Sequence, residues 1–214
     1  MAERVIYQLR RSYGILAGIS NCMSVQHFTP EGRNTIRWAS GTSTELFIHP
    51  SDGSFAERKF LFRISTATVD AEESAFTFFE GITRHLMILQ GRVELIHEGR
   101  YTRQLEPFDQ DVFSGEWNTR SKGKVTDFNL LLKDGATGSL THHRIAADRT
   151  ASFNATSEYY FIYFAFGGAA LSTGNTAQAG DLLRITRGSD LTVQAQVSCD
   201  LVVIEVLPPK SIAD

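Results

Sequence analysis

The chain has 214 residues, of which 42% are hydrophobic and 21% are charged, and its formal net charge is −3. These values are typical of a globular protein with one large domain or two small ones closely joined. Both charge signs are mixed along the chain, which argues against a nucleic-acid-binding stripe and against a charged tail. The longest apolar stretch, residues 159–171, is too short to cross a bilayer. We therefore expect neither a nucleic-acid partner nor a membrane span.

The cysteine content and the first residues both indicate a cytoplasmic protein. Cys22 and Cys199 are too few for a disulfide framework, although a single disulfide between them stays open. The first residues have no long apolar core followed by a small-residue cleavage site.

Short β-rich runs separated by turn sequences follow one another along most of the chain. Helical periodicity is scarce. Many short strands with close turns are typical of an all-β sandwich or barrel, and the order of the runs suits two jelly-roll modules. The predicted strands lie within residues 37–49, 59–69, 84–99, 125–133, 158–166, 181–188, 191–197 and 200–208.

Four of these strands carry polar side chains on a face that also holds apolar ones. Residues two apart in a strand point to the same face, so Asp127 and Asn129 share a face with Val125 and Leu131. Exposure to solvent is the simplest explanation, because one face of many antiparallel sheets is wet. It would also leave the apolar neighbours wet in every strand. The corresponding polar residues on the other strands are Glu45, Arg63, Ser65 and Arg84.

A barrel interior with an apolar bottom and a polar mouth avoids that exposure. Buried charges there need partners, because an unpaired buried polar group costs about 1–3 kcal/mol and a charge costs more. We therefore expect Arg63 and Arg84 to pair with Glu45 and Asp127 inside one pocket. Ser65 and Asn129 are expected to complete the hydrogen bonds, and Thr42 and Ser43 to add hydroxyl groups from a loop.

Four segments resemble, in order and spacing, the motifs of the HutD/Ves family. The segments are IRWASGTSTELFIHP at 36–50, FLFRISTATV at 60–69, ESAFTFFEGITRHLMILQG at 73–91, and PFDQDVFSGEW followed by VTDFNLLLKDG within 107–135. The resemblance covers about residues 36–135, and the remainder is similar in strand pattern. The sequence departs from the family pattern at Phe62, where tryptophan is usual.

The resemblance implies a bicupin, in which two cupin-like antiparallel β-barrels pack as one compact unit over residues 1–214. The first barrel, with the polar pocket, would centre on about residues 36–135, and the second would lie mainly in residues 136–207. The family is associated with bacterial histidine utilisation, and its Ves-type members are linked to stress or cold response. The resemblance therefore implies a metal-free pocket for a small acid such as N-formylglutamate or urocanate.

The residues themselves also argue against a metal and against a nucleophile. A metal-binding cupin needs two histidines one residue apart, followed by a carboxylate and another histidine. None of the six histidines forms that motif, and the adjacent His142 and His143 would point to opposite faces of a strand. Gly-x-Ser-x-Gly elbows, P-loops and dinucleotide fingerprints are also missing. We predict no metal and no cofactor.

The first functional hypothesis is non-catalytic binding of a small anionic metabolite, which would regulate histidine utilisation or a stress response. Arg63, with Arg84, would present a planar guanidinium fork to a ligand carboxylate. Trp38, Phe76 and Phe78 would supply apolar walls or a rim.

Two other functions stay open. The pocket could belong to a metal-free isomerase or hydrolase that uses Glu45 and Asp127 as acid and base. It could also serve only stability. Long antiparallel edges need protection, so we further expect a homodimer. The aromatic run at residues 158–166 should pack between the two barrels.

Overall fold

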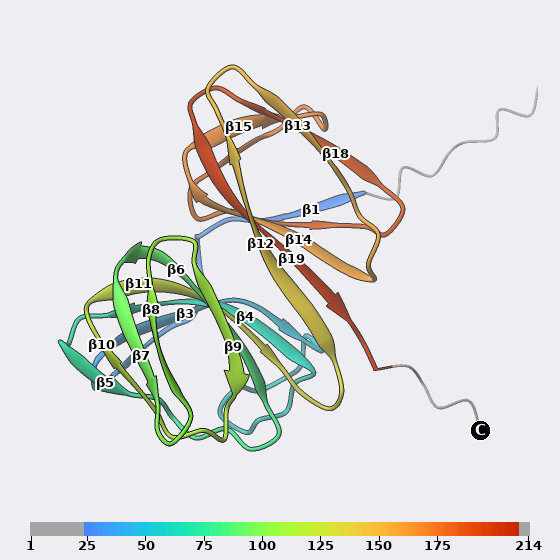
Figure 1. The fold of residues 1–214 in the computed structure, drawn as a ribbon. Helices are drawn as coiled ribbons and strands as arrows, with labels where there is room; N and C mark the ends of the chain where they lie inside the picture. The colour runs from blue at the N-terminus through green and yellow to red at the C-terminus, as the bar shows by residue number, and fades with distance from the viewer. Residues whose placement is uncertain (1–23, 210–214) are drawn as a thin grey trace, which may run out of the picture.

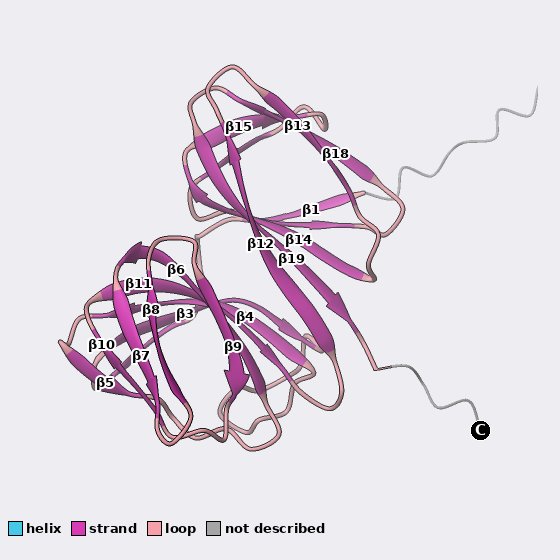
Figure 2. Cartoon of the chain, in the orientation of Figure 1, coloured by secondary structure: helices cyan, strands magenta, loops and turns pink. Residues whose placement is uncertain are grey.

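The computed structural model describes residues 24–209, and the regular secondary structure of these residues consists of β-strands (Figure 2). This confirms the predicted all-β class. Within these residues, no helix is long and apolar enough to cross a membrane. Cys22, and with it any pairing to Cys199, lies outside the described residues.

The strands of residues 24–209 form two units, each built from two antiparallel sheets (Figure 1). The first unit contains β2 (Thr35–Trp38), β3 (Gly41–His49), β4 (Phe62–Val69), β5 (Glu73–Ala75), β6 (Thr83–Gly91), β7 (Val93–His97), β8 (Tyr101–Leu105), β9 (Gln110–Ser114), β10 (Thr119–Lys122) and β11 (Val125–Leu132). The second contains β1 (Val25–Phe28), β12 (Thr137–Ile145), β13 (Thr150–Asn154), β14 (Tyr159–Phe166), β15 (Gly168–Leu171), β16 (Thr176–Gln178), β17 (Leu182–Ile185), β18 (Asp190–Ala195) and β19 (Cys199–Leu207).

Each unit is a jelly-roll sandwich. In the first unit, the sheet β2-β3-β4-β11-β6-β9 packs on the sheet β5-β10-β7-β8. In the second, the sheet β1-β17-β14-β19-β12 packs on the sheet β13-β18-β15-β16. Strand pairing stays within each of these four sheets in the described chain, so the units are open sandwiches where closed barrels were expected. The predicted arrangement of two cupin-like units is confirmed.

The six-stranded sheet of the first unit and the five-stranded sheet of the second share one apolar core. Phe62 and Phe128 enter this inter-unit core from the first unit, and Phe161 enters it from the second. Tyr159 also lies there, and its hydroxyl is 2.9 Å from Nε2 of His49. One face of the aromatic run at residues 158–166 therefore packs between the units, and the other face fills the interior of the second unit. The prediction that the run packs between the units holds for the first face, which holds the units together by hydrophobic contact.

This packing explains why polar and apolar residues alternate in the central strands. In β4, Phe62 and Ile64 face the inter-unit core, whereas Arg63 and Ser65 face the interior of the first unit. The same alternation occurs in β11, where polar and apolar residues also take turns along the strand. Both faces of the central strands β4 and β11 are thus largely buried, and Arg63, Ser65 and Asp127 lie inside the protein.

A β-bulge in β3 changes the alternation that the sequence predicts. Glu45 pairs with Ser65 and Phe47 pairs with Ile64, so Leu46 is an additional residue in the strand. Simple alternation places Glu45 and Phe47 on one face. The bulge instead places Phe47 in the inter-unit core, leaving Glu45 beside the inward face.

Strand β1 precedes the first unit in the chain but belongs to the second unit. It pairs with β17 along its whole length, from Val25 opposite Ile185 to Phe28 opposite Leu182. Arg33, in the following turn, donates hydrogen bonds to the carbonyl oxygens of Gly180 and Phe28, at 2.6 and 2.9 Å. The second unit is therefore built from strands that precede and strands that follow the first unit in the sequence (Figure 1).

Candidate functional site

A cavity of about 200 Å³ lies inside the first unit, on the inward face of β3, β4, β6 and β11. The segments 53–61 and 74–79 cover its other sides. We call it the arginine cavity, because three guanidinium groups line it. Its charged and aromatic lining residues are Trp38, Phe55, Arg58, Arg63, Phe76, Phe79, Arg84 and Asp127.

Arg63 is the best supported of the three arginines. Its Nε donates to Oε2 of Glu45 at 2.8 Å, and its Nη1 donates to Oγ of Ser65 at 2.9 Å. Its guanidinium carbon lies 4.1 Å from the ring centroid of Phe55. Burial lowers the pKa of Arg63 and the Glu45 carboxylate opposes that change, so the group stays charged at neutral pH. Its orientation is fixed before any ligand arrives.

Arg84 is less well satisfied. Its Nε is buried and has no hydrogen-bond partner among residues 24–209. The guanidinium carbon lies 4.5 Å from the ring centroid of Phe79 and 5.1 Å from that of Phe76. Burial lowers the pKa of Arg84 to about 10, against the attraction of Asp127. Arg84 is therefore a half-buried cation that packs against aromatic faces and whose buried Nε has no acceptor in the described residues.

Asp127 and Asn129 lie side by side on the inward face of β11. The Asn129 amide donates a hydrogen bond to Oδ1 of Asp127. Asp127 is only 4% exposed. Burial raises its pKa from 3.8 to about 7, although the Asn129 hydrogen bond and the charge of Arg84 both act in the opposite direction. At neutral pH this carboxyl group can exist in either protonation state.

Arg58, which the sequence did not suggest, completes the set of cations. It lies in the irregular segment between β3 and β4, with a φ of 58°, and donates to the carbonyl oxygen of Phe55. Its guanidinium carbon lies 4.2 Å from the ring centroid of Phe79 and 4.7 Å from that of Phe55. Strand alternation gives no signal for such a residue, because a loop conformation places it.

Most of the predicted site residues come together. Trp38, Arg63, Ser65, Arg84, Asp127 and Asn129 all line the arginine cavity, together with Ser43 and Phe76. Glu45 stands behind Arg63 and fixes it.

Two predicted residues point elsewhere. Thr42 lies within β3 and not in a loop, and its hydroxyl is 2.7 Å from that of Thr68. It is out of step with the cavity-lining Ser43, so it sits on the other face of the strand. Phe78 is 63% exposed and is absent from the cavity wall.

One of the two predicted ion pairs forms in the described residues. Arg63 pairs with Glu45, whereas Arg84 and Asp127 are too far apart for an ion pair. Three guanidinium groups thus line the cavity, and among residues 24–209 Arg63 is the one of them with an ion-pair partner. The cavity carries an excess of positive charge that an anion can neutralise.

Comparison with known proteins identifies the family. The HutD family model matches residues 31–203. This chain belongs to the HutD family. A curated relative in Pseudomonas putida, described as an uncharacterized 21.2 kDa protein in the hutC 3′ region, is 38% identical over 76 residues. The alignment covers 34% of this chain and 40% of that protein, so the match spans less than half of the relative's length. The position of that relative links HutD proteins to the histidine-utilisation locus.

Solved structures of similar fold include a HutD protein and a bacterial pirin. A conserved protein of unknown function from Pseudomonas aeruginosa has a TM-score of 0.73 at 21% identity, covering 86% of this chain and 98% of that chain. HutD from Pseudomonas fluorescens, solved in a formate condition, has a TM-score of 0.68 at 20% identity, with the same coverage. The bacterial pirin YhhW from Escherichia coli in complex with nickel(II) has a TM-score of 0.64 at 13% identity, covering 86% and 99%. These similarities establish a cupin- and pirin-type fold.

In this HutD chain the histidines serve other contacts. Among residues 24–209, no three His, Cys, Asp or Glu side chains are grouped so as to hold a metal ion. His142 lies 2.8 Å from Oδ1 of Asp200, whereas the adjacent His143 packs against Phe153 with ring centroids 5.4 Å apart. The two histidines therefore diverge, as predicted.

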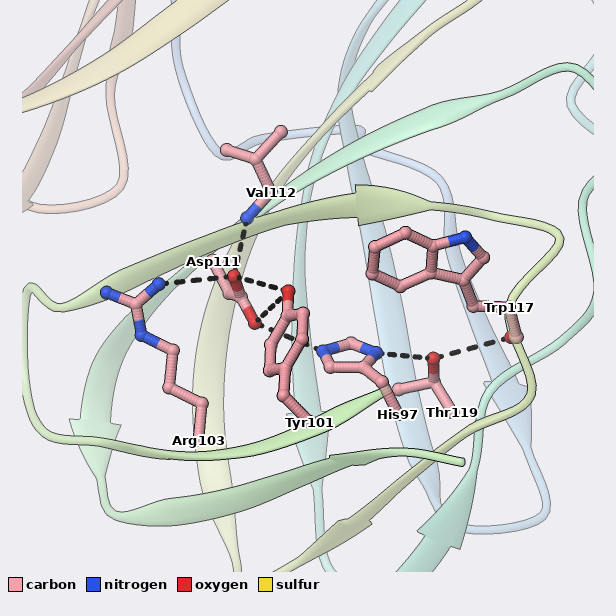
Figure 3. Close-up of polar contacts among 7 residues, drawn as sticks. All are labelled: His97, Tyr101, Arg103, Asp111, Val112, Trp117 and Thr119. Atoms are coloured by element: carbon pink, nitrogen blue, oxygen red, sulfur yellow. Dashed lines mark hydrogen bonds and ion pairs between the residues drawn. The ribbon is translucent and has the colours of Figure 1, made fainter. Parts of the chain in front are cut away.

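A second buried carboxylate of the first unit, Asp111 on β9, has several hydrogen-bonding partners (Figure 3). Asp111 accepts hydrogen bonds from the Tyr101 hydroxyl at 3.1 Å, Arg103 Nη1 at 3.3 Å and the Val112 backbone at 2.9 Å. Nε2 of His97 lies 3.1 Å from its other oxygen. These contacts connect β9 of one sheet to β7 and β8 of the other. Asp111 therefore ties the two sheets together where strand pairing does not.

Proposed function

We propose that the arginine cavity binds a small carboxylate metabolite without converting it. The observation that carries this proposal is Arg84, a half-buried guanidinium that lines the cavity and has no ion-pair partner among residues 24–209. A largely desolvated charge without a partner is costly, and a ligand carboxylate beside the guanidinium would supply the opposite charge. Arg63, held in place by Glu45, would offer a second fork in the same cavity.

The candidate ligands are acids of histidine breakdown, such as N-formylglutamate or urocanate. Membership of the HutD family and the position of the P. putida relative beside hutC support this choice. Aromatic rings on several sides of the cavity would contact the carbon skeleton of such a ligand. A binder that changes nothing chemically would act by reporting the concentration of its ligand. We therefore propose a regulatory role in histidine utilisation or a stress response, in the cytoplasm, and we keep the homodimer as a prediction.

Calorimetric titration tests the binding proposal. N-formylglutamate, urocanate and glutamate are titrated into the wild type and into Arg84→Ala. A lost charge-assisted hydrogen bond weakens binding by about 1.5–3 kcal/mol, or about ten- to a hundredfold. The matched control is Arg92→Ala, because Arg92 is an exposed arginine whose partner is Glu106. Equal affinities in wild type and Arg84→Ala would remove the cavity as the binding site.

A metal-free enzyme is the second candidate, and one observation favours it. Asp127 titrates near neutral pH inside the cavity, which is the property expected of a general acid or base. Glu45, the other acid considered, is bound to Arg63 and is poorly placed to exchange protons. Following the same compounds by NMR in the presence of protein separates the two functions. Product formation that Asp127→Asn abolishes would establish the enzyme, and saturable shifts without product would support the binder.

A further inference from the structure

Asp127 is a buried carboxyl group with little to stabilise its charge. Within residues 24–209, its one hydrogen-bond donor is the Asn129 amide. Asp111, equally buried, receives contacts from four groups, one of them a histidine and one an arginine. Several donors or a close cation are needed to keep a buried carboxylate ionised. Asp127 meets this requirement only weakly.

The cation that favours ionised Asp127 also lines the cavity. Arg84 attracts the Asp127 charge from the neighbouring strand β6, without a direct ion pair in the described chain. Both side chains line the arginine cavity. A ligand carboxylate bound to Arg84 would therefore stand next to Asp127 and would compete for the same positive charge. Two carboxylates that share one buried site do not both stay ionised near neutral pH.

We propose that Asp127 takes up a proton when a carboxylate ligand binds to Arg84, and that the neutral carboxyl group then donates a hydrogen bond to the ligand. This inference rests on the proposed function, since it requires an anion in the cavity. The proton comes from solvent, and no covalent bond to carbon changes. Asp127 is then a positioning residue that selects ligands able to accept a hydrogen bond and disfavours binding in alkaline solution.

The other charged groups around the cavity do not compete for this role. Arg58 and Arg63 are guanidinium groups and stay protonated at any pH at which the protein functions. Glu45, on β3, is fixed by the 2.8 Å contact with Arg63. The remaining polar lining from β3, β4 and β5 consists of the hydroxyl groups of Ser43, Ser65 and Ser74, which do not titrate. Asp127 is thus the cavity group through which a bound anion can exchange a proton with solvent.

The affinity should follow a simple pH law. Burial already raises the pKa of Asp127 to about 7 in the empty cavity, and the ligand charge raises it further. Below that pH the affinity is constant. Above it, each ligand must bring one proton with it, so the dissociation constant rises about tenfold per pH unit until the pKa of the complex is reached.

Calorimetry in two buffers measures this proton directly. N-formylglutamate is the probe, because neither of its carboxylates titrates near pH 7. The titration is run near pH 7 in Tris and in Bis-Tris, which are cationic and do not occupy an anion site. The difference in heat, divided by the difference in buffer ionisation heat, gives the protons taken up per ligand. We expect a substantial fraction of one proton for the wild type and none for Asp127→Asn.

The control is Glu45→Gln, in which affinity should fall while the proton uptake per bound ligand stays the same. Binding without any buffer dependence would overturn the inference and leave the proposed function standing. Uptake that persists in Asp127→Asn would likewise overturn it. If no probe gives any heat or any NMR shift, the proposed function itself fails. If Asp127→Asn does not fold, the ¹³Cγ resonance of Asp127 in the wild type decides: it must move toward the protonated value when ligand is added.

Discussion

The two units have the same architecture, but their interiors differ in polarity. The inner space of the second unit is filled by apolar side chains, among them Ile162, Phe164, Leu183 and Val193. In the first unit, the strands β4, β6 and β11 place Arg63, Arg84 and Asp127 in the equivalent space between the sheets, and an open cavity remains. A jelly roll is therefore stable with a solid apolar centre, and the polar centre needs a separate explanation. We propose ligand binding for the first unit, which also has an apolar cluster of its own, and stability alone for the interior of the second.

The largest expected effect on stability comes from creating a void in the apolar interior of the second unit. Phe164 is fully buried in the core of the second unit. Phe164→Ala should lower the free energy of unfolding by about 3–5 kcal/mol, because it removes buried apolar surface and leaves a void. Denaturant unfolding measures the loss. Titration of the folded variant should show unchanged ligand affinity, and weakened binding would contradict the division between the units.

Replacing Asp111, the buried acid with several hydrogen-bonding partners, should lower the free energy of unfolding slightly less. Asp111→Ala leaves buried His97 without its acceptor and breaks the link between β9 and the four-stranded sheet. We expect a loss of about 3 kcal/mol in unfolding free energy, as for other broken buried pairs. Arg103→Ala is the control, since Arg103 is more than half exposed and its contact with Asp111 is at the surface edge. It should change stability by less than about 1 kcal/mol.

Asp127, whose hydrogen-bond donor in residues 24–209 is the Asn129 amide, should make the free energy of unfolding depend on pH. The pKa of Asp127 is raised from 3.8 to about 7 on folding, so between these values the folded state binds more protons than the unfolded state. The contribution of Asp127 is fully present below pH 3.8 and is lost as the pH rises to about 7. Between pH 4 and 8, the wild type should lose about 3–4 kcal/mol more than Asp127→Asn. Parallel curves from urea unfolding at several pH values would contradict the raised pKa.

The smallest expected effect is an increase in the free energy of unfolding. Arg84→Met removes a largely desolvated charge that has no ion-pair partner in residues 24–209 and replaces it with an apolar chain of similar length. The free energy of unfolding should rise by about 1 kcal/mol, while ligand binding weakens about ten- to a hundredfold, as in Arg84→Ala. Arg63→Met is the matched variant, and it should destabilise the protein, because Glu45 and Ser65 lose their partner. Thermal unfolding of both variants without ligand separates the two roles, and destabilisation by Arg84→Met would show that Arg84 is structural.

The sequence was most informative where strands are regular. Alternation places Arg63 beside Ser65 and Asp127 beside Asn129 on inward faces, because a strand that is buried on both sides allows no other arrangement. It also separates His142 from His143.

The sequence was less informative where the backbone departs from that rule. The bulge at Leu46 reverses the face of Phe47, and no local residue preference announces it. Thr42 was assigned to the pocket because residues 41–44 resemble a loop, whereas they continue β3. Arg58 depends on a loop conformation, and Asp111 depends on partners from β7, β8 and the following residue. Contacts of that kind are set by tertiary geometry, which strand patterns do not encode.

The crossing of β1 has a consequence for how the protein is made. A ribosome releases Val25–Phe28 early, yet the strand that completes its pairing, Leu182–Ile185, emerges only after the whole first unit has been synthesised. The earliest strand must therefore wait, with its edge uncovered, while the intervening segment folds. During that interval the nascent chain exposes a short adhesive edge, and a factor that shields it would protect the protein from aggregation.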